Sequence, residues 1–172
     1  MPTYAMISSY TVSGSSVANI DFNGISQNYT DIVAVCSLRG TQTATTTTLL
    51  SIINANRGNI YDGIVLKGDG SSGTSARWNF TDGTYYYAPA GTMTAASAAS
   101  NTFSNHIINY FGYSLTNVNK QFVARSNNPN TITEAVVNRY FYDIAITRLT
   151  FYPAAGNFDV GSKITLYGIK AG

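Results

Sequence analysis

The sequence predicts an all-β protein, a two-layered antiparallel sandwich of the jelly-roll-like type. Turn-forming residues recur roughly every 8 to 15 positions along the chain, which is typical of a sandwich or jelly roll. The segments between them alternate apolar and polar residues or are short apolar runs, and no long stretch keeps apolar residues at helical spacing. With 172 residues, the chain is expected to form a single β-sandwich domain over 1–172 that needs no metal or disulfide to fold.

Five strands are expected in the first half of the chain. Ile20 and Phe22 alternate with Asn19 and Asp21, so one face of that segment should be buried. The segment 31–38 is apolar on both faces, which is typical of a central strand. The others end at Gly, Asn, Asp and Ser residues that favour turns. The five segments are 17–22, 31–38, 48–55, 60–67 and 76–80.

The middle of the chain is expected to contain a long loop over about residues 85–101. Pro89 precedes a tract of small residues that could support a helical turn but has little apolar surface to anchor it. Strands are expected to resume after this loop, with a second loop at 126–130. The later strands are predicted at 102–111, 121–125 and 134–143.

The last segment, 144–172, is expected to form a closing hairpin. Leu149 and Phe151 alternate with polar residues, and so do Ile164 and Leu166 further along. A turn with proline and glycine at 153–156 separates the two predicted strands. Because no catalytic segment follows the hairpin, we expect a self-contained β building block rather than an enzyme.

The composition indicates a weakly charged surface. Only 10% of the residues are charged, against about 25% in ordinary soluble domains, and polarity comes from Ser, Thr, Asn and 13 tyrosines. Such a surface suits dense packing against copies of itself or against a host surface. The net charge of +2 includes no basic run, so we expect no nucleic-acid binding and no membrane attachment. A secretory signal is not expected either, because no positive region precedes an apolar core at the start.

Residues that could do chemistry do not form a recognisable catalytic or metal motif. Cys36 lies in an apolar run and is expected to be a buried, inert thiol. His106 is the only histidine, and a strand histidine that is hydrogen-bonded or at an interface is favoured over a catalytic relay. One His and one Cys cannot form the usual zinc site within a monomer, although three copies around a symmetry axis could still build a histidine site.

The acidic residues and the glycine-rich segment have simple structural interpretations. The 8 acids are scattered, mostly at strand ends or in turns, and a glycosidase-like pair of carboxylates is not favoured. The segment 68–73 lacks the features of a phosphate or calcium loop and is expected to be a tight turn. We therefore expect no catalytic residues, no cofactor and no metal.

The tyrosine triplet Tyr85, Tyr86 and Tyr87 is the candidate interaction surface. Successive strand residues point to opposite faces, so three adjacent rings cannot all lie in the core. Tyrosine offers contact area and a hydroxyl at low entropic cost. Two alternatives remain open, namely stacking of the rings under a long loop and a platform for sugar binding.

Short motifs spread in order along almost the full length also carry a family resemblance. They are YAMI at 4–7, YTV at 10–12, IDFNGI at 20–25, YTDIV at 29–33, GDGSS at 68–72 and GSKITLYGI at 161–169. On these motifs the chain resembles virion proteins of tailed bacteriophages, similar to capsid decoration (cement) subunits and to tail-fibre or receptor-binding domains. The resemblance implies a jelly-roll-like fold and commonly a homotrimer, and it brings no catalytic motif.

Between these roles, capsid decoration is the expected one. In addition to the segments given above, a strand is expected to begin within a few residues of Met1, which leaves no room for the stalk or adaptor of a tail fibre. A decoration subunit would be made in the host cytoplasm and would bind the major capsid protein on the outer surface of the virion, stabilising the assembled shell by mass action. The alternative is a tail-fibre or receptor-binding, lectin-like module that contacts a host glycan.

Overall fold

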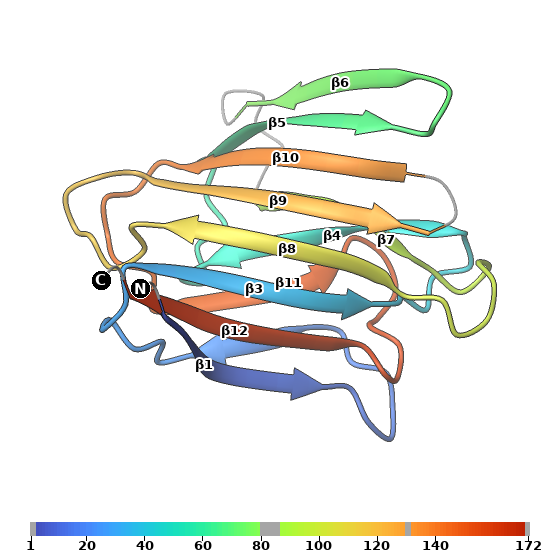
Figure 1. Cartoon of the computed structure of the whole chain (residues 1–172), viewed down its shortest axis with the longest axis horizontal. Coiled ribbons are helices and arrows are strands. Elements are labelled where there is room, and N and C mark those ends of the chain that lie inside the picture. The colour runs from blue at the N-terminus through green and yellow to red at the C-terminus, as the bar shows by residue number, and fades with distance from the viewer. Residues whose placement is uncertain (1–2, 80–86, 130–131, 171–172) are drawn as a thin grey trace.

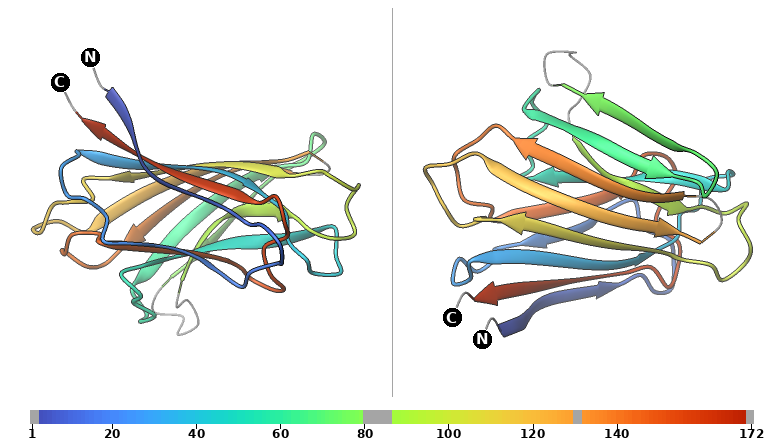
Figure 2. Two further views of the ribbon diagram at one scale, coloured as in Figure 1. Left: turned by 90° about the horizontal axis from the view of Figure 1, so that it is seen from below. Right: turned by 45° about the horizontal axis from the view of Figure 1, so that its top comes forward.

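The computed structural model describes residues 3–79, 87–129 and 132–170, and all elements in this part of the chain are β-strands. The strands form two antiparallel sheets stacked as a sandwich (Figure 2). The prediction of a two-layered, jelly-roll-like β-sandwich is thereby confirmed. The twelve strands are β1 (Thr3–Thr11), β2 (Ile20–Asn23), β3 (Asp31–Leu38), β4 (Thr46–Ile53), β5 (Tyr61–Gly68), β6 (Gly73–Trp78), β7 (Ala88–Thr94), β8 (Ser104–Phe111), β9 (Lys120–Asn128), β10 (Ile132–Tyr140), β11 (Arg148–Pro153) and β12 (Lys163–Lys170).

The two sheets differ in width. The larger sheet has eight strands in the order β1-β12-β3-β8-β9-β10-β5-β6, and the smaller has four in the order β2-β11-β4-β7. Figure 1 looks onto the larger sheet, with β4, β7 and β11 of the smaller sheet behind it. The smaller sheet therefore covers one face of the larger sheet, which we call its inner face, and leaves the opposite outer face uncovered.

The hydrophobic core lies between the two sheets. In β3 the side chains that belong to the core cluster are at every second position, from Ile32 to Leu38, and Val33 between them is buried as well. On the smaller sheet Phe22 of β2 packs edge-to-face on Phe151 of β11, with ring centroids 6.2 Å apart. Burying an aliphatic or aromatic side chain of this kind stabilises the fold by about 1.5–3 kcal/mol. The inward side chains of both sheets thus form one core cluster.

The predicted long loop at about 85–101 is wrong over its first part, because residues 88–94 form strand β7. The small residues there allow the strand to approach the inner face of the larger sheet closely, and β7 contacts β8, β9 and β10. Gly91 is essential to this approach, since a Cβ atom there would lie 2.3 Å from Oγ of Ser126 and its φ is +107°. The small residues of this segment therefore indicate close packing between β7 and the larger sheet, and not a loop.

The second predicted loop, 126–130, is also wrong in part. Strand β9 continues to Asn128, although the segment is polar in sequence. Its polar groups find partners inside the sandwich: Oγ of Ser126 donates to Glu134, and Nδ2 of Asn128 lies 3.4 Å from Oγ1 of Thr94. Because these groups are hydrogen-bonded, polarity does not end the strand here.

The predicted closing hairpin does not form. Strand β11 pairs with β2 and β4 in the smaller sheet, whereas β12 pairs with β1 and β3 in the larger one. The connection crosses between the layers, and Phe158 in its middle is fully buried and bridges to Val17. The alternation of Leu149 with Thr150 therefore does not reveal the sheet to which the strand belongs, because the two sheets share one core.

Candidate interaction surface

The predicted tyrosine surface is described only in part. Tyr85 and Tyr86 lie outside the described residues. Tyr87 is half-buried, and its ring packs edge-to-face on Tyr152 with centroids 6.0 Å apart. Arg57 lies over the same Tyr152 ring at 5.5 Å. The described contact of Tyr87 is thus with the smaller sheet of its own chain.

The histidine and the cysteine considered for catalysis are both buried. His106 is fully buried, with Nδ1 3.0 Å from the carbonyl oxygen of Ala90 and Nε2 3.1 Å from Oγ of Ser104. Burial lowers the pKa of His106 to about 4. Burial likewise raises the pKa of the Cys36 thiol well above its usual range, which keeps it protonated and unreactive. Both are inner-face residues, as expected for a hydrogen-bonded strand histidine and a buried thiol.

Glu134 is a second buried polar group on the inner face, one that the sequence did not single out. Its carboxylate accepts hydrogen bonds from the backbone N–H of Thr92 at 2.6 Å, from Oγ1 of Thr92 at 2.8 Å and from Oγ of Ser126 at 3.1 Å. These bonds tie β7 of the smaller sheet to β9 and β10 of the larger one. Charge-assisted hydrogen bonds of this kind are among the stronger polar contacts in proteins. Glu134 therefore stabilises the packing of the smaller sheet on the larger one.

Three further acids have partners within the chain. Asp62 pairs with Arg139 at 2.8 Å and Asp21 with Arg148 at 2.9 Å. Asp69 accepts the backbone N–H groups of Ser71 and Ser72, which hold the pKa of its carboxyl well below its usual range and confirm the predicted tight turn. Within residues 3–79, 87–129 and 132–170, no group of three or more His, Cys, Asp or Glu could hold a metal ion. In the same part of the chain no helix is long and apolar enough to cross a membrane.

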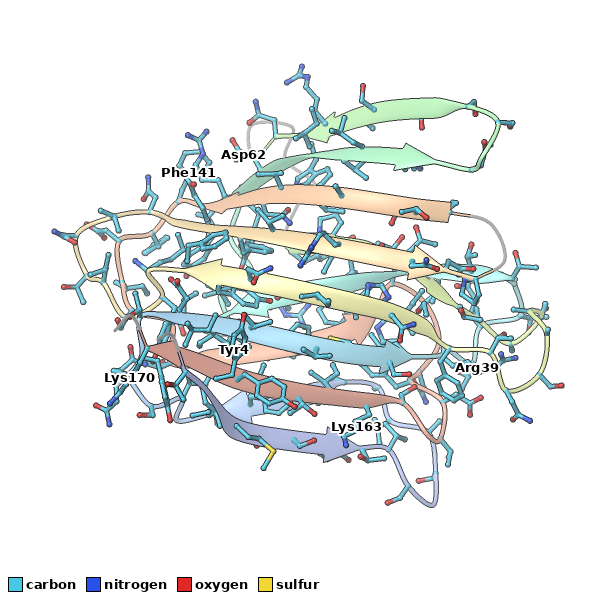
Figure 3. All side chains as sticks on the ribbon, in the orientation of Figure 1. Tyr4, Arg39, Asp62, Phe141, Lys163 and Lys170 are labelled. Carbon is cyan, nitrogen blue, oxygen red and sulfur yellow. The ribbon has the colours of Figure 1, made fainter. Side chains whose placement is uncertain are left out.

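Exposed apolar side chains gather on the outer face of the larger sheet. Met6 of β1 is 66% exposed and Leu66 of β5 is 55% exposed. Figure 3 places Tyr4 over the β1 and β12 end of this face and Asp62 at its β5 end. We define the outer apolar surface as Tyr4, Met6, Val35, Ile64, Leu66, Ile107, Phe111 and Val137.

The strand register makes this surface continuous. Side chains that are directly opposite on neighbouring strands share a face. In one row that crosses the sheet, the successive partners are Val35, Ile107, Arg125, Ala135 and Leu66. This row runs over five adjacent strands, from β3 to β5, and only one of its members is charged.

Four members of this row, all except Val35, line the floor of a groove. The groove is open, has a volume of about 830 Å³ and extends over β5, β6, β8, β9 and β10. Leu66, Ile107 and Ala135 supply its aliphatic lining, while Asn105 and Asn127 add amides along one side. Its volume is within the range of about 300–1,000 Å³ that is usual for ligand pockets. The groove is therefore a concave site of ligand size on the outer face.

Comparison with known proteins does not assign a family. No protein-family model matches the chain, and no curated protein sequence matches it. Among solved structures, galectin LEC-6 of Caenorhabditis elegans is 12% identical, covering 95% of this chain and 96% of its own, with a TM-score of 0.32. A human SPRY domain is 9% identical over 96% of both chains with a TM-score of 0.36. A legume lectin-like domain from Entamoeba histolytica is 12% identical, covering 100% of this chain and 90% of its own, with a TM-score of 0.33.

The sequence contained one signal for the outer apolar surface. The segment 31–38 is apolar on both faces, and this pattern predicted a central strand. In the structure Ile32 and Ala34 are in the core, while Val35 is 43% exposed on the outer face. A strand that is apolar on both sides can be covered by its own chain on one side only. The second side then remains available to a partner.

Proposed function

We propose that this chain is a non-catalytic structural protein of a tailed-bacteriophage particle, a capsid decoration subunit that binds and stabilises the assembled head shell. It is located on the outer surface of the virion, after synthesis in the host cytoplasm, and its partners are the major capsid protein and further copies of itself in a homotrimer. The resemblance of its short motifs to phage virion proteins is the basis for the phage assignment. The structure adds a second support for the proposal, the outer apolar surface, which suits binding to a head shell.

The observation that carries the proposal is the outer apolar surface. Monomeric soluble proteins rarely leave a large contiguous apolar patch uncovered. Here eight large apolar side chains are exposed on the uncovered face of one sheet. Their burial against a shell would contribute the apolar core of an interface, and the weak overall charge limits repulsion between closely packed copies. Repetition over many equivalent shell sites would add avidity.

The test is the copy number of this protein in purified particles of the phage that encodes it. Quantitative gel electrophoresis against the major capsid protein should give hundreds of copies per particle, located on the head by immunogold labelling. A stoichiometry near a dozen, or labelling of the tail, would refute the decoration role.

The alternative function is a receptor-binding, lectin-like module of a tail fibre. The feature that favours it is the groove, because Asn105, Asn127 and Thr74 offer amide and hydroxyl groups to a ligand along its lining. A glycan array tests this alternative. Binding that is lost in the groove variant N105A/N127A or in the triple variant Y85A/Y86A/Y87A would support it, and an array without binding would count against it.

A further inference from the structure

Arg125 lies on the floor of the groove, and no neighbouring outward position holds an acid. The other charged residues of the lining are Lys67 and Glu134, and the Glu134 carboxylate is already bonded to Thr92 and Ser126 on the inner face. Directly across the strands it faces Ile107 and Ala135. Along its own strand the next outward residues are Val123 and Asn127. The diagonal outward positions on β8 and β10 are Asn105, Asn109, Thr133 and Val137. None of these surrounding residues is an acid, and no ion pair joins Arg125 to any acid in the described part of the chain.

Other arginines in the same fold have partners within the chain. Arg139, on the outer face of the neighbouring strand β10, pairs with Asp62 directly across from it. Arg148 of the smaller sheet pairs with Asp21 through both Nε and NH2. The fold therefore neutralises an outward arginine where a cross-strand acid is present. Arg125 is surrounded instead by aliphatic and amide side chains, in a concave site.

We propose that this groove binds a segment of the major capsid protein. An acidic side chain of that segment pairs with Arg125, and aliphatic side chains on either side of it pack on Ile107, Ala135 and Leu66. This inference rests on the decoration function proposed above and names the chemistry of its contact. Burying an arginine without a counter-charge is costly, so a partner that covers the groove must bring an acid. A guanidinium can hold a carboxylate in a bidentate pair, which fixes the orientation of the partner.

The lining of the groove favours a protein segment over a polysaccharide. Its floor is aliphatic, and none of the residues that line it is aromatic. A sugar would have to place hydroxyl groups against Leu66 and Ile107 without hydrogen-bond partners there, which costs free energy. Aliphatic side chains of a protein bury the same surface favourably. An acidic polysaccharide is therefore the competing occupant for the experiment to exclude.

A second copy of this chain bound face to face is a poor occupant. A two-fold symmetric contact across the outer face uses the same patch on both subunits. It would bring the two groove arginines toward one another with no acid between them, and like charges in an interface are repulsive. Trimer contacts between copies are therefore expected at other surfaces, with the groove left free for the shell.

The experiment uses purified head shells of the encoding phage that lack this protein. The full-length chain is added back, the shells are sedimented, and bound protein is measured at increasing concentration and at two salt concentrations. The variants are R125Q and R125E in the groove. R148Q is the control, because it removes the same charge from the smaller sheet. Circular dichroism and thermal melting confirm that each variant is folded.

Wild-type protein and R148Q should bind with affinities within about twofold of each other, whereas R125Q should bind at least about tenfold more weakly and R125E more weakly still. Higher salt should weaken wild-type binding more than R125Q binding. If wild-type and R125E bind equally well, the groove contact is refuted and the decoration function stands. If the wild-type chain does not bind shells, the decoration function and this contact both fail. Arginine-dependent binding to polygalacturonate without binding to shells would identify the polysaccharide as the occupant and overturn the proposal.

Discussion

The two faces of strands β8, β9 and β10 each carry residues of the kind that is usually found on the opposite side. The covered inner face carries polar side chains that are buried: Ser104, His106, Ser126, Asn128, Glu134 and Asn138. The uncovered outer face of the same strands carries apolar side chains that are exposed: Ile107, Phe111 and Val137. Within the chain, hydrogen bonds satisfy Glu134 and His106 on the inner face. No second layer from the described part of the chain covers the outer face, and this is the side on which we propose that the partner binds.

The largest expected effect on stability comes from adding a methyl group at Gly91, where β7 packs on the buried polar side chains of the inner face. In G91A the new Cβ would lie 2.3 Å from Oγ of Ser126, in a backbone conformation with φ of +107°. Overpacking and the positive φ together should lower the free energy of unfolding by about 3 kcal/mol or more. Urea denaturation measures this loss.

Gly14 provides the matched control for this substitution. It also has a positive φ, +75°, but a Cβ added there would meet no atom within 4 Å. G14A should therefore cost only about 1 kcal/mol of backbone strain. Equal losses in G14A and G91A would show that β7 does not approach β9 as closely as described.

The second-largest expected loss of stability comes from removing the buried carboxylate of Glu134. E134A would leave the N–H and hydroxyl of Thr92 and the hydroxyl of Ser126 without their acceptor. Unsatisfied buried donors cost roughly 1–3 kcal/mol each, and relaxation or entry of water would reduce the sum, so we expect a loss of about 3 kcal/mol in urea denaturation. T133A, one residue earlier and exposed on the outer face, should change the stability by less than about 0.5 kcal/mol.

The buried histidine predicts a pH dependence. The pKa of His106 falls from 6.5 to about 4 in the folded chain, so between these values the unfolded chain binds more protons than the folded one. The stabilising effect of the neutral imidazole is complete above about pH 6.5 and is lost as the pH falls toward 4. The loss is on the order of 3 kcal/mol at about 1.4 kcal/mol per pKa unit.

Urea denaturation at several pH values between 4 and 7.5 measures this loss. The variant H106Q provides the comparison, because glutamine does not titrate in this range. Its stability should fall less steeply over the same window. Parallel curves for the two proteins would contradict the assignment of a depressed pKa to this side chain.

The smallest expected effect is on the outer face. Because Leu66 is 55% exposed, L66S should change the free energy of unfolding by no more than about 0.5 kcal/mol. The same kind of truncation in the core, L49A at a fully buried position, should cost about 2–5 kcal/mol. A large loss in L66S would mean that the outer face already supports the fold of the isolated chain, and the inference of a missing partner would lose its basis.

Local sequence pattern determined most strand positions well. The predicted strand at 31–38 coincides with β3, and the segment 60–67 is displaced by one residue from β5. Both are bounded by turn-forming residues and contain apolar residues at strand spacing. The pattern failed where small or polar residues form buried strands, as at Gly91 in β7 and Ser126 in β9. There the determining partner is on another strand, distant in sequence.

The candidate surface was harder to predict than the fold. The tyrosine triplet was chosen because of its composition, and only Tyr87 lies in the described part of the chain. The outer apolar surface combines residues from β1, β3, β5, β8 and β10, which are adjacent only through the pairing of strands. Apolar residues with this surface role have the same local pattern as core residues, so sequence alone could not separate them.

By itself, the sequence determined that this protein is a weakly charged, all-β sandwich whose strands begin and end near its turn residues. The physical reason is local, since alternation and turn propensity act over a few residues. Only the tertiary structure decided that β11 and β12 belong to different sheets, that His106 and Glu134 face inward, and that Arg125 faces outward between aliphatic neighbours. Those properties depend on which distant strands pair and on which face of the larger sheet the smaller one covers.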